Sequence, residues 1–316
     1  MKKFKTGQGL NCFYGSVTNI LNSYEINITE SELIVLSNAL NCSLITSESK
    51  LYFGILNEKV YDGLASIDIL CNPIEKIDKM MCDLHDGIPV LFKTNTGLLK
   101  YSDVYQNTSR THYVVLLSIQ NDKLLISDSF VSSIPKSTFE GYIDLLPVKS
   151  MCEKTNQFGY VLSMGSLKKT RALFDIERKK IKEKIINYAI ENIELSTESV
   201  IYKLYLLCKY MVKSSMEMLV DDHIMEFVYI MKFNGSIDRI LYLIELVKMY
   251  CVADNHIVEE LSFLHAKWIV ITNKLLKCSI LKNSDFYKRI FEIDIPKLLK
   301  DEQEIYNDLI QSEMKS

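Results

Sequence analysis

Turn-forming residues are distributed unevenly along this chain of 316 residues, and their distribution limits the folds that the chain can adopt. Ten of the eleven glycines and four of the five prolines lie at or before Gly165. Glycine and proline interrupt regular structure and mark turns, so the first half must change direction often, whereas the second half can form long helices. We therefore predict a mixed α+β domain over residues 1–167 and an all-helical domain over residues 168–316.

Composition and charge narrow the class of protein. Apolar residues make up 48% of the chain and charged residues 24%, as in globular proteins that bury a core. The net charge of −3 argues against a nucleic-acid partner held through phosphate contacts. We expect no membrane association, because no stretch is apolar for long enough to span a bilayer and the basic start lacks the apolar segment of a signal peptide. The eight scattered cysteines indicate reduced thiols, so we expect a cytoplasmic protein.

Local patterns predict the elements of the first half. Apolar residues at 17, 20, 21 and 24 have the spacing of one helical face, and Thr29 with Glu32 has the capping-box spacing that begins a second helix. A short helix is expected around Ile74–Leu84, whereas residues 42–72 show no clear pattern and are expected to be irregular. Asn121-Asp122 predicts a hairpin turn. Apolar, β-branched segments predict strands at 88–93, 113–120, 123–127 and 158–164.

The second half carries helical periodicity almost throughout. The one clear interruption is Asn234-Gly235, after which Ser236 is a suitable N-cap. The predicted helices are 178–193, 200–219, 222–233, 237–252, 258–281 and 285–310.

A cysteine stands where the first helix is expected to begin. Cys12 follows a segment broken by Gly7 and Gly9. A helix N-terminus presents unpaired N–H groups and a positive partial charge, which favour the thiolate, the nucleophilic form of cysteine. A lone cysteine is more often a small buried apolar residue, so a catalytic role requires a base elsewhere in the chain.

A histidine and an aspartate are placed to complete such a site. His112 begins an apolar strand, and Asp128 follows the strand after the Asn121-Asp122 turn. Antiparallel pairing around that turn brings the two residues to the same end of the hairpin. The aspartate can then orient the imidazole, as in a catalytic triad. We predict Cys12 as the nucleophile, His112 as the base and later the acid, and Asp128 as the residue that fixes the imidazole tautomer.

An acyl-transfer site also needs donors for the oxyanion and a pocket for the substrate. The backbone N–H of Cys12 is one expected donor, and the side-chain amide of Gln8 or of Asn11 is the second; we favour Gln8, because its neighbouring glycines allow the loop to fold back. Three tyrosines are predicted to line the substrate pocket, namely Tyr101, Tyr105 and Tyr113.

The order of these residues resembles a known family. Gln8, then Cys12 at the start of a helix, then the His-Tyr-Val-Val strand that begins at His112, then Asp128 after a hairpin, is similar to the layout of papain-like cysteine peptidases of the bacteriocin-processing type. It resembles still more the BtrH-type acyltransferases of natural-product biosynthesis and the amide-forming enzymes of closthioamide-type pathways. The resemblance covers residues 7–40 and 88–130, and is only architectural for 168–316. It implies a papain-like cysteine-protease fold with a C-terminal all-helical domain.

The resemblance also implies an activity. In BtrH-type enzymes the cysteine takes an acyl group from the phosphopantetheine thioester of an acyl or peptidyl carrier protein and passes it to an amine. We therefore expect an amide-forming acyltransferase of nonribosomal natural-product biosynthesis, with a carrier protein and an amine acceptor as partners. Two alternatives stay open. The same triad can hydrolyse a peptide or amide, as in a cysteine peptidase or amidase, or the scaffold can serve as a binding module without catalysis.

Two further features allow a functional or a plain interpretation. Cys82 and His85 have the spacing of half a zinc site, but no second pair accompanies them, so we expect no metal and no cofactor. The basic run Lys168–Lys184 is either a solvated helix face or a docking site for an acidic carrier protein.

Overall fold

The computed structural model describes residues 4–47, 50–102, 111–133, 136–215, 227–228, 231, 236–251, 255–281 and 284–315. The chain divides into two compact units. The first consists of Met1–Leu33 and Asn57–Arg178, and the second of Ile34–Leu56 and Lys179–Ser316. The described residues form an α+β protein with a six-stranded antiparallel sheet, as the sequence predicts at this level.

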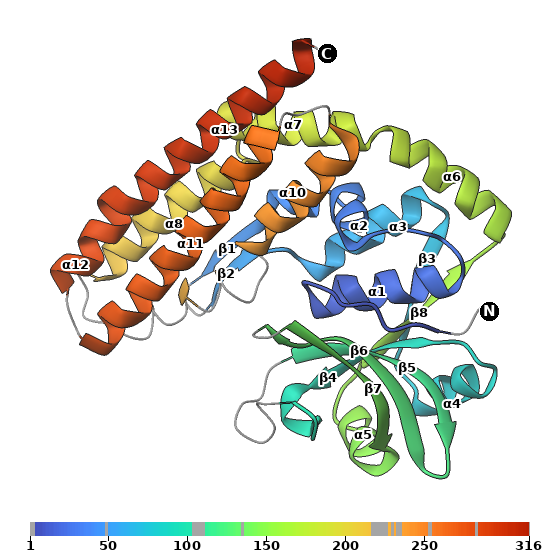
Figure 1. Cartoon of the computed structure of the whole chain (residues 1–316). Helices are drawn as coiled ribbons and strands as arrows, with labels where there is room; N and C mark the ends of the chain where they lie inside the picture. Colours follow the sequence, from blue (N-terminus) through green and yellow to red (C-terminus); the bar gives the residue numbers. More distant parts are fainter. Residues whose placement is uncertain are drawn as a thin grey trace. The chain divides into compact units, whose positions relative to one another are not determined.

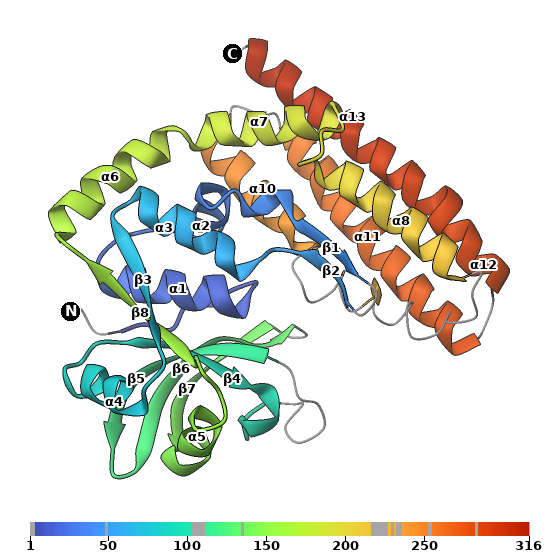
Figure 2. The same cartoon turned by 180° about the vertical axis from the view of Figure 1, so that it is seen from behind.

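The first unit contains the six-stranded sheet, whose strand order is β3-β8-β4-β5-β6-β7. Figure 2 shows β3 and β8 paired at one edge of this sheet. The strands are β3 (Ile69–Ile74), β4 (Val90–Asn95), β5 (Thr111–Gln120), β6 (Lys123–Ser133), β7 (Lys136–Asp144) and β8 (Gly159–Met164). The α-helices of this unit are α1 (Cys12–Ser23), α3 (Val60–Ser66), α4 (Ile77–His85), α5 (Leu145–Cys152) and α6 (Leu167–Lys179), and α2 (Glu30–Leu36) crosses into the second unit.

Helices cover both faces of the sheet (Figure 1). Helix α1 packs on β5 and β6 from one side. Helices α4 and α5 lie on the other side, where an apolar cluster joins their inner residues to those of the central strands. The cluster includes Met80, Leu84, Val114, Leu116, Leu124, Ile126, Leu145 and Val148. The sheet therefore forms the surface on which α1 packs.

The predicted hairpin turn is present. Gln120 pairs with Lys123, and the two residues between them, Asn121 and Asp122, have φ angles of 48° and 58°. Positive φ at both central positions is the geometry that joins two twisted strands with the least distortion, and Asn and Asp adopt it more readily than most residues. The turn fixes the register of β5 against β6.

The second unit is mainly helical. Its α-helices are α7 (Ile181–Ile193), α8 (Val200–Ser215), α10 (Asp238–Tyr250), α11 (Asn255–Leu281), α12 (Ser284–Arg289) and α13 (Ile295–Lys315). A π-helical turn, η4 (Ile290–Asp294), precedes α13, and the unit also contains the hairpin β1 (Ser43–Ser47) and β2 (Lys50–Gly54). Short 3-10 turns occur at η1 (Ala39–Asn41) in this unit and at η2 (Asn57–Lys59) and η3 (Thr96–Leu98) in the first. None of the helices in the described part of the chain is long and apolar enough to cross a membrane.

The two compact units differ in two places from the domains predicted from the sequence. Helix α6 belongs with the first unit almost to its end, and Ile34–Leu56 belongs with the helical unit. The second difference has a physical cause. Lys203 of α8 donates through Nζ to the carbonyl oxygens of Asn41 and Cys42, at 3.1 Å each. Ser236 donates to the carbonyl of Phe53, which is fully buried. These contacts bind the segment around β1 and β2 to the helices.

Several predicted elements need correction. Residues 42–72 are not irregular, because they contain β1, β2, α3 and the start of β3. The predicted helix 178–193 is divided between α6 and α7, and 285–310 is divided by η4. Pro296 explains the second division: it has no N–H to bond four residues back, and a π-helical turn absorbs that mismatch. The predicted helix 222–233 lies almost entirely outside the described residues.

Two arginines of the basic run Lys168–Lys184 form ion pairs within the chain. Arg171 forms an ion pair with Glu25, and Arg178 forms one with Glu32. Arg178 also lies over the ring of Phe174, with its guanidinium carbon 4.4 Å from the ring centroid. The two arginines are two helical turns apart on α6, so one face of this helix binds the loop between α1 and α2 and the first turn of α2. A role in docking a carrier protein stays a prediction.

Candidate active site

The nucleophile predicted from the sequence is the first residue of α1. Asn11 is the N-cap, and its side-chain Oδ1 accepts from the N–H groups of Phe13 (2.8 Å) and Tyr14 (3.1 Å). The Asn11 carbonyl accepts from the N–H of Gly15 at 2.9 Å. Within the described chain, no acceptor is found for the remaining N–H of the first turn, that of Cys12 itself. This donor is therefore available to a ligand at the thiol.

The loop before Cys12 is held by a glutamate that the sequence analysis missed. The two carboxylate oxygens of Glu30 accept from the N–H groups of Leu10 (2.8 Å) and Asn11 (2.9 Å). Glu30 follows Thr29, and the capping-box pattern there directed attention to Glu32 instead. That box is present, with Thr29 N–H donating to Glu32 and Glu32 N–H donating to the Thr29 hydroxyl. No local pattern in the sequence indicates that Glu30 reaches back to this loop.

Gly9 allows the loop to lie close to α1. A Cβ atom at this position would lie 3.0 Å from the Cα of Gly15 and 3.0 Å from Oε2 of Glu30. The Gly9 N–H donates to the carbonyl of Ser129 on β6 at 2.9 Å. A side chain larger than hydrogen would push the loop away from both the helix and the strand, and would move the thiol with it.

The two residues proposed as oxyanion donors have different surroundings. Asn11 uses its amide oxygen as the helix cap, which directs its side chain along the first turn. Gln8 is exposed and stands between two anchored glycines, since Gly7 exchanges hydrogen bonds with Asn19 and Gly9 binds Ser129. The assignment of either side-chain amide as the oxyanion donor stays a prediction.

His112 and Asp128 are brought together as the hairpin predicts. Val115 pairs with Ser127, so His112 and Asp128 are diagonal neighbours on the same face of β5 and β6. The His112 Nε2 lies 2.8 Å from Asp128 Oδ2. Both side chains are almost completely buried. The second ring nitrogen, Nδ1, is then the one left for Cys12, whose negative charge raises the pKa of His112.

The protonation of His112 follows from its neighbours. Burial lowers its pKa, but the negative charges of Cys12 and Asp128 and the hydrogen bonds to both raise it by more, to about 10 from an ordinary value of 6.5. The imidazolium is therefore the favoured form at neutral pH when a thiolate and a carboxylate lie beside it. A Cys12 thiolate beside a His112 imidazolium would combine a nucleophile with a nearby acid.

Asp128 is fixed by more than the histidine. Its Oδ1 accepts from the N–H of Phe130 at 2.9 Å, and its Oδ2 accepts from the hydroxyl of Tyr101 at 2.9 Å. The Tyr101 ring stacks on Phe139, with the centroids 3.8 Å apart and the planes within 6°. Burial and the Asp128 charge raise the pKa of Tyr101, so the phenol remains a donor. The Tyr101 hydroxyl is therefore bound to Asp128, and a role for this residue in lining a substrate pocket stays a prediction.

Of the other two residues predicted to line the pocket, the structure describes Tyr113 but not Tyr105, which lies outside the described residues. Tyr113 is 7% exposed and packs edge-on against Phe13, with centroids 4.8 Å apart. Tyr113 therefore supports the start of α1 and offers little surface to a substrate.

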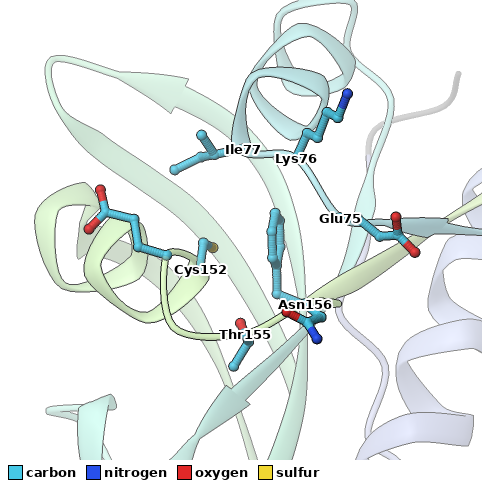
Figure 3. Close-up of a pocket in the computed structure, with 8 residues that line it drawn as sticks. Glu75, Lys76, Ile77, Cys152, Thr155 and Asn156 are labelled. Carbon is cyan, nitrogen blue, oxygen red and sulfur yellow. The ribbon is translucent and has the colours of Figure 1, made fainter.

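A pocket in the first unit does not coincide with these residues. It has a volume of about 540 Å³ and lies between the start of α4 and the segment from α5 to β8 (Figure 3). Glu75, Lys76 and Ile77 border it on one side, and Cys152 and Phe158 are buried beneath it. Cys82 is exposed, and no group of three or more metal-binding side chains occurs among the residues that the structure describes.

No protein-family model and no curated protein matches the chain in sequence comparisons. The chemistry of the site therefore has to be argued from its geometry. A cysteine at a helix N-terminus, a hydrogen-bonded histidine and a buried orienting aspartate form an arrangement that can carry out nucleophilic acyl transfer.

Proposed function

We propose that this chain is a cysteine-dependent acyltransferase with a papain-like catalytic unit and a helical second unit. The observation that carries the proposal is the buried hydrogen bond between His112 and Asp128, with the Cys12 thiol at the first residue of a helix and its charge raising the pKa of His112. The donor we propose is a carrier-protein thioester, and the acceptor is an amine. The order of motifs shared with BtrH-type enzymes supports this choice over other acyl donors.

The first half-reaction acylates Cys12. The thiolate attacks the thioester carbonyl carbon, and the negative charge on the carbonyl oxygen is stabilised by the Cys12 N–H. The bond from carbon to the carrier sulfur then breaks. The imidazolium of His112 gives its proton to the departing thiolate, so the products are an acyl-cysteine, a free carrier thiol and a neutral imidazole.

The second half-reaction forms the amide. The amine nitrogen attacks the acyl-cysteine, and His112 takes the proton that the amine loses. The carbon–sulfur bond breaks, and the thiolate and imidazolium are restored. Asp128 keeps the imidazole in one orientation throughout, because Phe130 and Tyr101 hold its carboxylate. No oxidant or ATP is needed, since one thioester is exchanged for another before the amide forms.

The direct test is intact-protein mass spectrometry after the chain is mixed with an acyl-phosphopantetheine thioester. We expect one acyl group per chain on the wild type and none on Cys12→Ala. The matched control is Cys82→Ala, which removes an exposed thiol outside the site and should leave the adduct unchanged. Simple amines should then discharge the adduct faster than water does.

Other outcomes would change the assignment. An adduct that water clears at the same rate whatever amine is present would favour a peptidase or amidase with the same triad. The catalytic assignment would be contradicted if no thioester gave an adduct and Cys12 were no more reactive toward iodoacetamide than Cys82. The chain would then be a binding module without catalysis.

A further inference from the structure

Large apolar side chains are exposed at intervals along one face of α11. The helix turns Leu261, Leu264, Trp268 and Leu275 into the unit, and all four are buried. On the opposite side Phe263 is 64% exposed, Val270 51% and Ile280 72%. Helices of globular proteins normally present polar residues to water, so a helix that is apolar on both sides indicates a contact surface.

The exposed positions follow a regular spacing. Starting at Glu259, steps of four and three residues reach seven positions, and every one of them is exposed. This α11 seam consists of Glu259, Phe263, Ala266, Val270, Asn273, Lys277 and Ile280. Alternation of four and three is the spacing with which two helices pack side by side in a coiled coil.

Charge along the seam distinguishes the two possible directions of a self-pair. In a parallel pair, Glu259 would face its own copy and Lys277 would face its own copy, and both contacts repel. In an antiparallel pair centred between Ala266 and Val270, Glu259 of one chain lies opposite Lys277 of the other, and Ala266 lies opposite Val270. The small Ala266 next to the two-fold axis lets the helices approach closely, and the charges attract at both ends.

We propose that α11 forms an antiparallel homodimer contact through this seam, with a second copy of the chain as the occupant. The proposal is independent of the catalytic assignment, because none of the residues of the seam belongs to the first unit. A single helix pair buries a small area compared with stable dimers, so the association is expected to be weak and dependent on concentration. Lys267 lies over the Phe263 ring and also pairs with Asp301, which holds this ring in place without covering it.

The test measures the mass of the full chain by sedimentation over concentrations from about 1 to about 500 µM, the range in which so small an interface should assemble. We expect the mass to approach twice that of one chain. Glu259→Lys alone and Lys277→Glu alone should each shift the dimerisation midpoint to at least tenfold higher concentration. The double variant should restore the midpoint, because the pair is then reversed and not removed.

A control variant and the circular dichroism spectrum show whether a change in dimerisation arises from the seam, from a change of charge elsewhere or from loss of helical structure. Glu304→Lys on α13 makes the same change of charge at an exposed position away from the seam, and should leave the midpoint unchanged. A chain that stays monomeric at every concentration overturns the proposal. The seam would then be a contact surface for a helix of a different protein. The proposal is also overturned if Glu259→Lys leaves the dimerisation midpoint unchanged. It is overturned equally if the double variant keeps its helical content but does not regain the wild-type midpoint.

Discussion

At the scale of single residues, the imidazole of His112 decides when the site can act as an acid. Its pKa is raised to about 10 although burial alone would lower it, so Cys12 and Asp128 must supply the difference. A raised pKa adds stability that is fully present below the unfolded value near 6.5 and is lost as the pH rises through about 10. We expect the imidazole NMR signal of His112 to titrate near pH 10, and earlier in Cys12→Ala and Asp128→Asn.

The unfolding free energy gives an independent check on the same titration. Between pH 6.5 and 10 it should fall more steeply in the wild type than in Asp128→Asn, because only the wild type loses the carboxylate–imidazolium attraction. A wild-type signal that titrates near 6.5, unaltered by either substitution, would show that the three side chains do not interact in solution.

Tyr101 provides a second prediction at this scale. Tyr101→Phe keeps the ring stacked on Phe139 and removes only the hydrogen bond to Asp128. With one donor fewer, the carboxylate acts more strongly on His112, so we expect the alkaline limit of acyl transfer to move to higher pH. The rate at neutral pH should fall by less than about tenfold, the usual effect of one hydrogen bond. The measurement is the pH profile of Cys12 acylation.

The same exchange elsewhere in the sheet is the control for Tyr101. Tyr142 is an exposed residue whose hydroxyl donates to Gln120, so Tyr142→Phe should leave the pH profile as it is. A Tyr101→Phe profile that is lower at every pH but not displaced would mean that Tyr101 only stabilises the fold.

At the scale of elements, the start of α1 joins capping to catalysis. Asn11→Ala removes the acceptor for the N–H groups of Phe13 and Tyr14, and should lower the unfolding free energy by about 1 kcal/mol. Asn11→Ser keeps an acceptor oxygen at the cap and removes the amide donor without adding a charge beside Cys12. Chemical denaturation measures the first effect, and the acylation rate of Cys12 measures the second.

The Asn11→Ser variant also separates the two proposed oxyanion donors. If Gln8 is the donor, Asn11→Ser should acylate at nearly the wild-type rate, and Gln8→Ala should be slower by about 10²-fold or more. The reverse pattern would assign the oxyanion to Asn11, and equal rates in both variants would leave the Cys12 N–H as the donor that matters.

The sequence predicts elements well where a short pattern determines them. The Asn121-Asp122 turn, the Thr29–Glu32 capping box and the helix that begins at Cys12 are all confirmed. Residues 42–72 were predicted wrongly because the β1–β2 hairpin depends on contacts with α8, which no local window contains. The same limit applies in the site: adjacent-strand geometry relates His112 to Asp128, whereas Glu30 acts through a loop that leaves no periodic signal.

At the scale of the whole molecule, the chain passes between the two units more than once. Ile34–Leu56 comes from the first half of the sequence and packs in the second unit. A fragment that ends at the predicted boundary, residue 167, would leave buried residues such as Leu40 and Phe53 without their helices. We expect this fragment to aggregate, whereas the full chain remains in solution; gel filtration and circular dichroism measure the difference. A monomeric fragment with native ellipticity would contradict the division.

Lys203 tests the same division in the intact protein. Its Nζ donates to the carbonyls of Asn41 and Cys42, so Lys203→Ala leaves two partly buried acceptors without a donor and should destabilise the chain by about 1–3 kcal/mol. Lys209→Ala, at an exposed position on the same helix, is the matched control. Amide hydrogen exchange should quicken in β1 and β2 before it quickens in the sheet of the first unit. An equal loss of protection in both units would mean that they open together, and that Ile34–Leu56 couples them and does not belong to one alone.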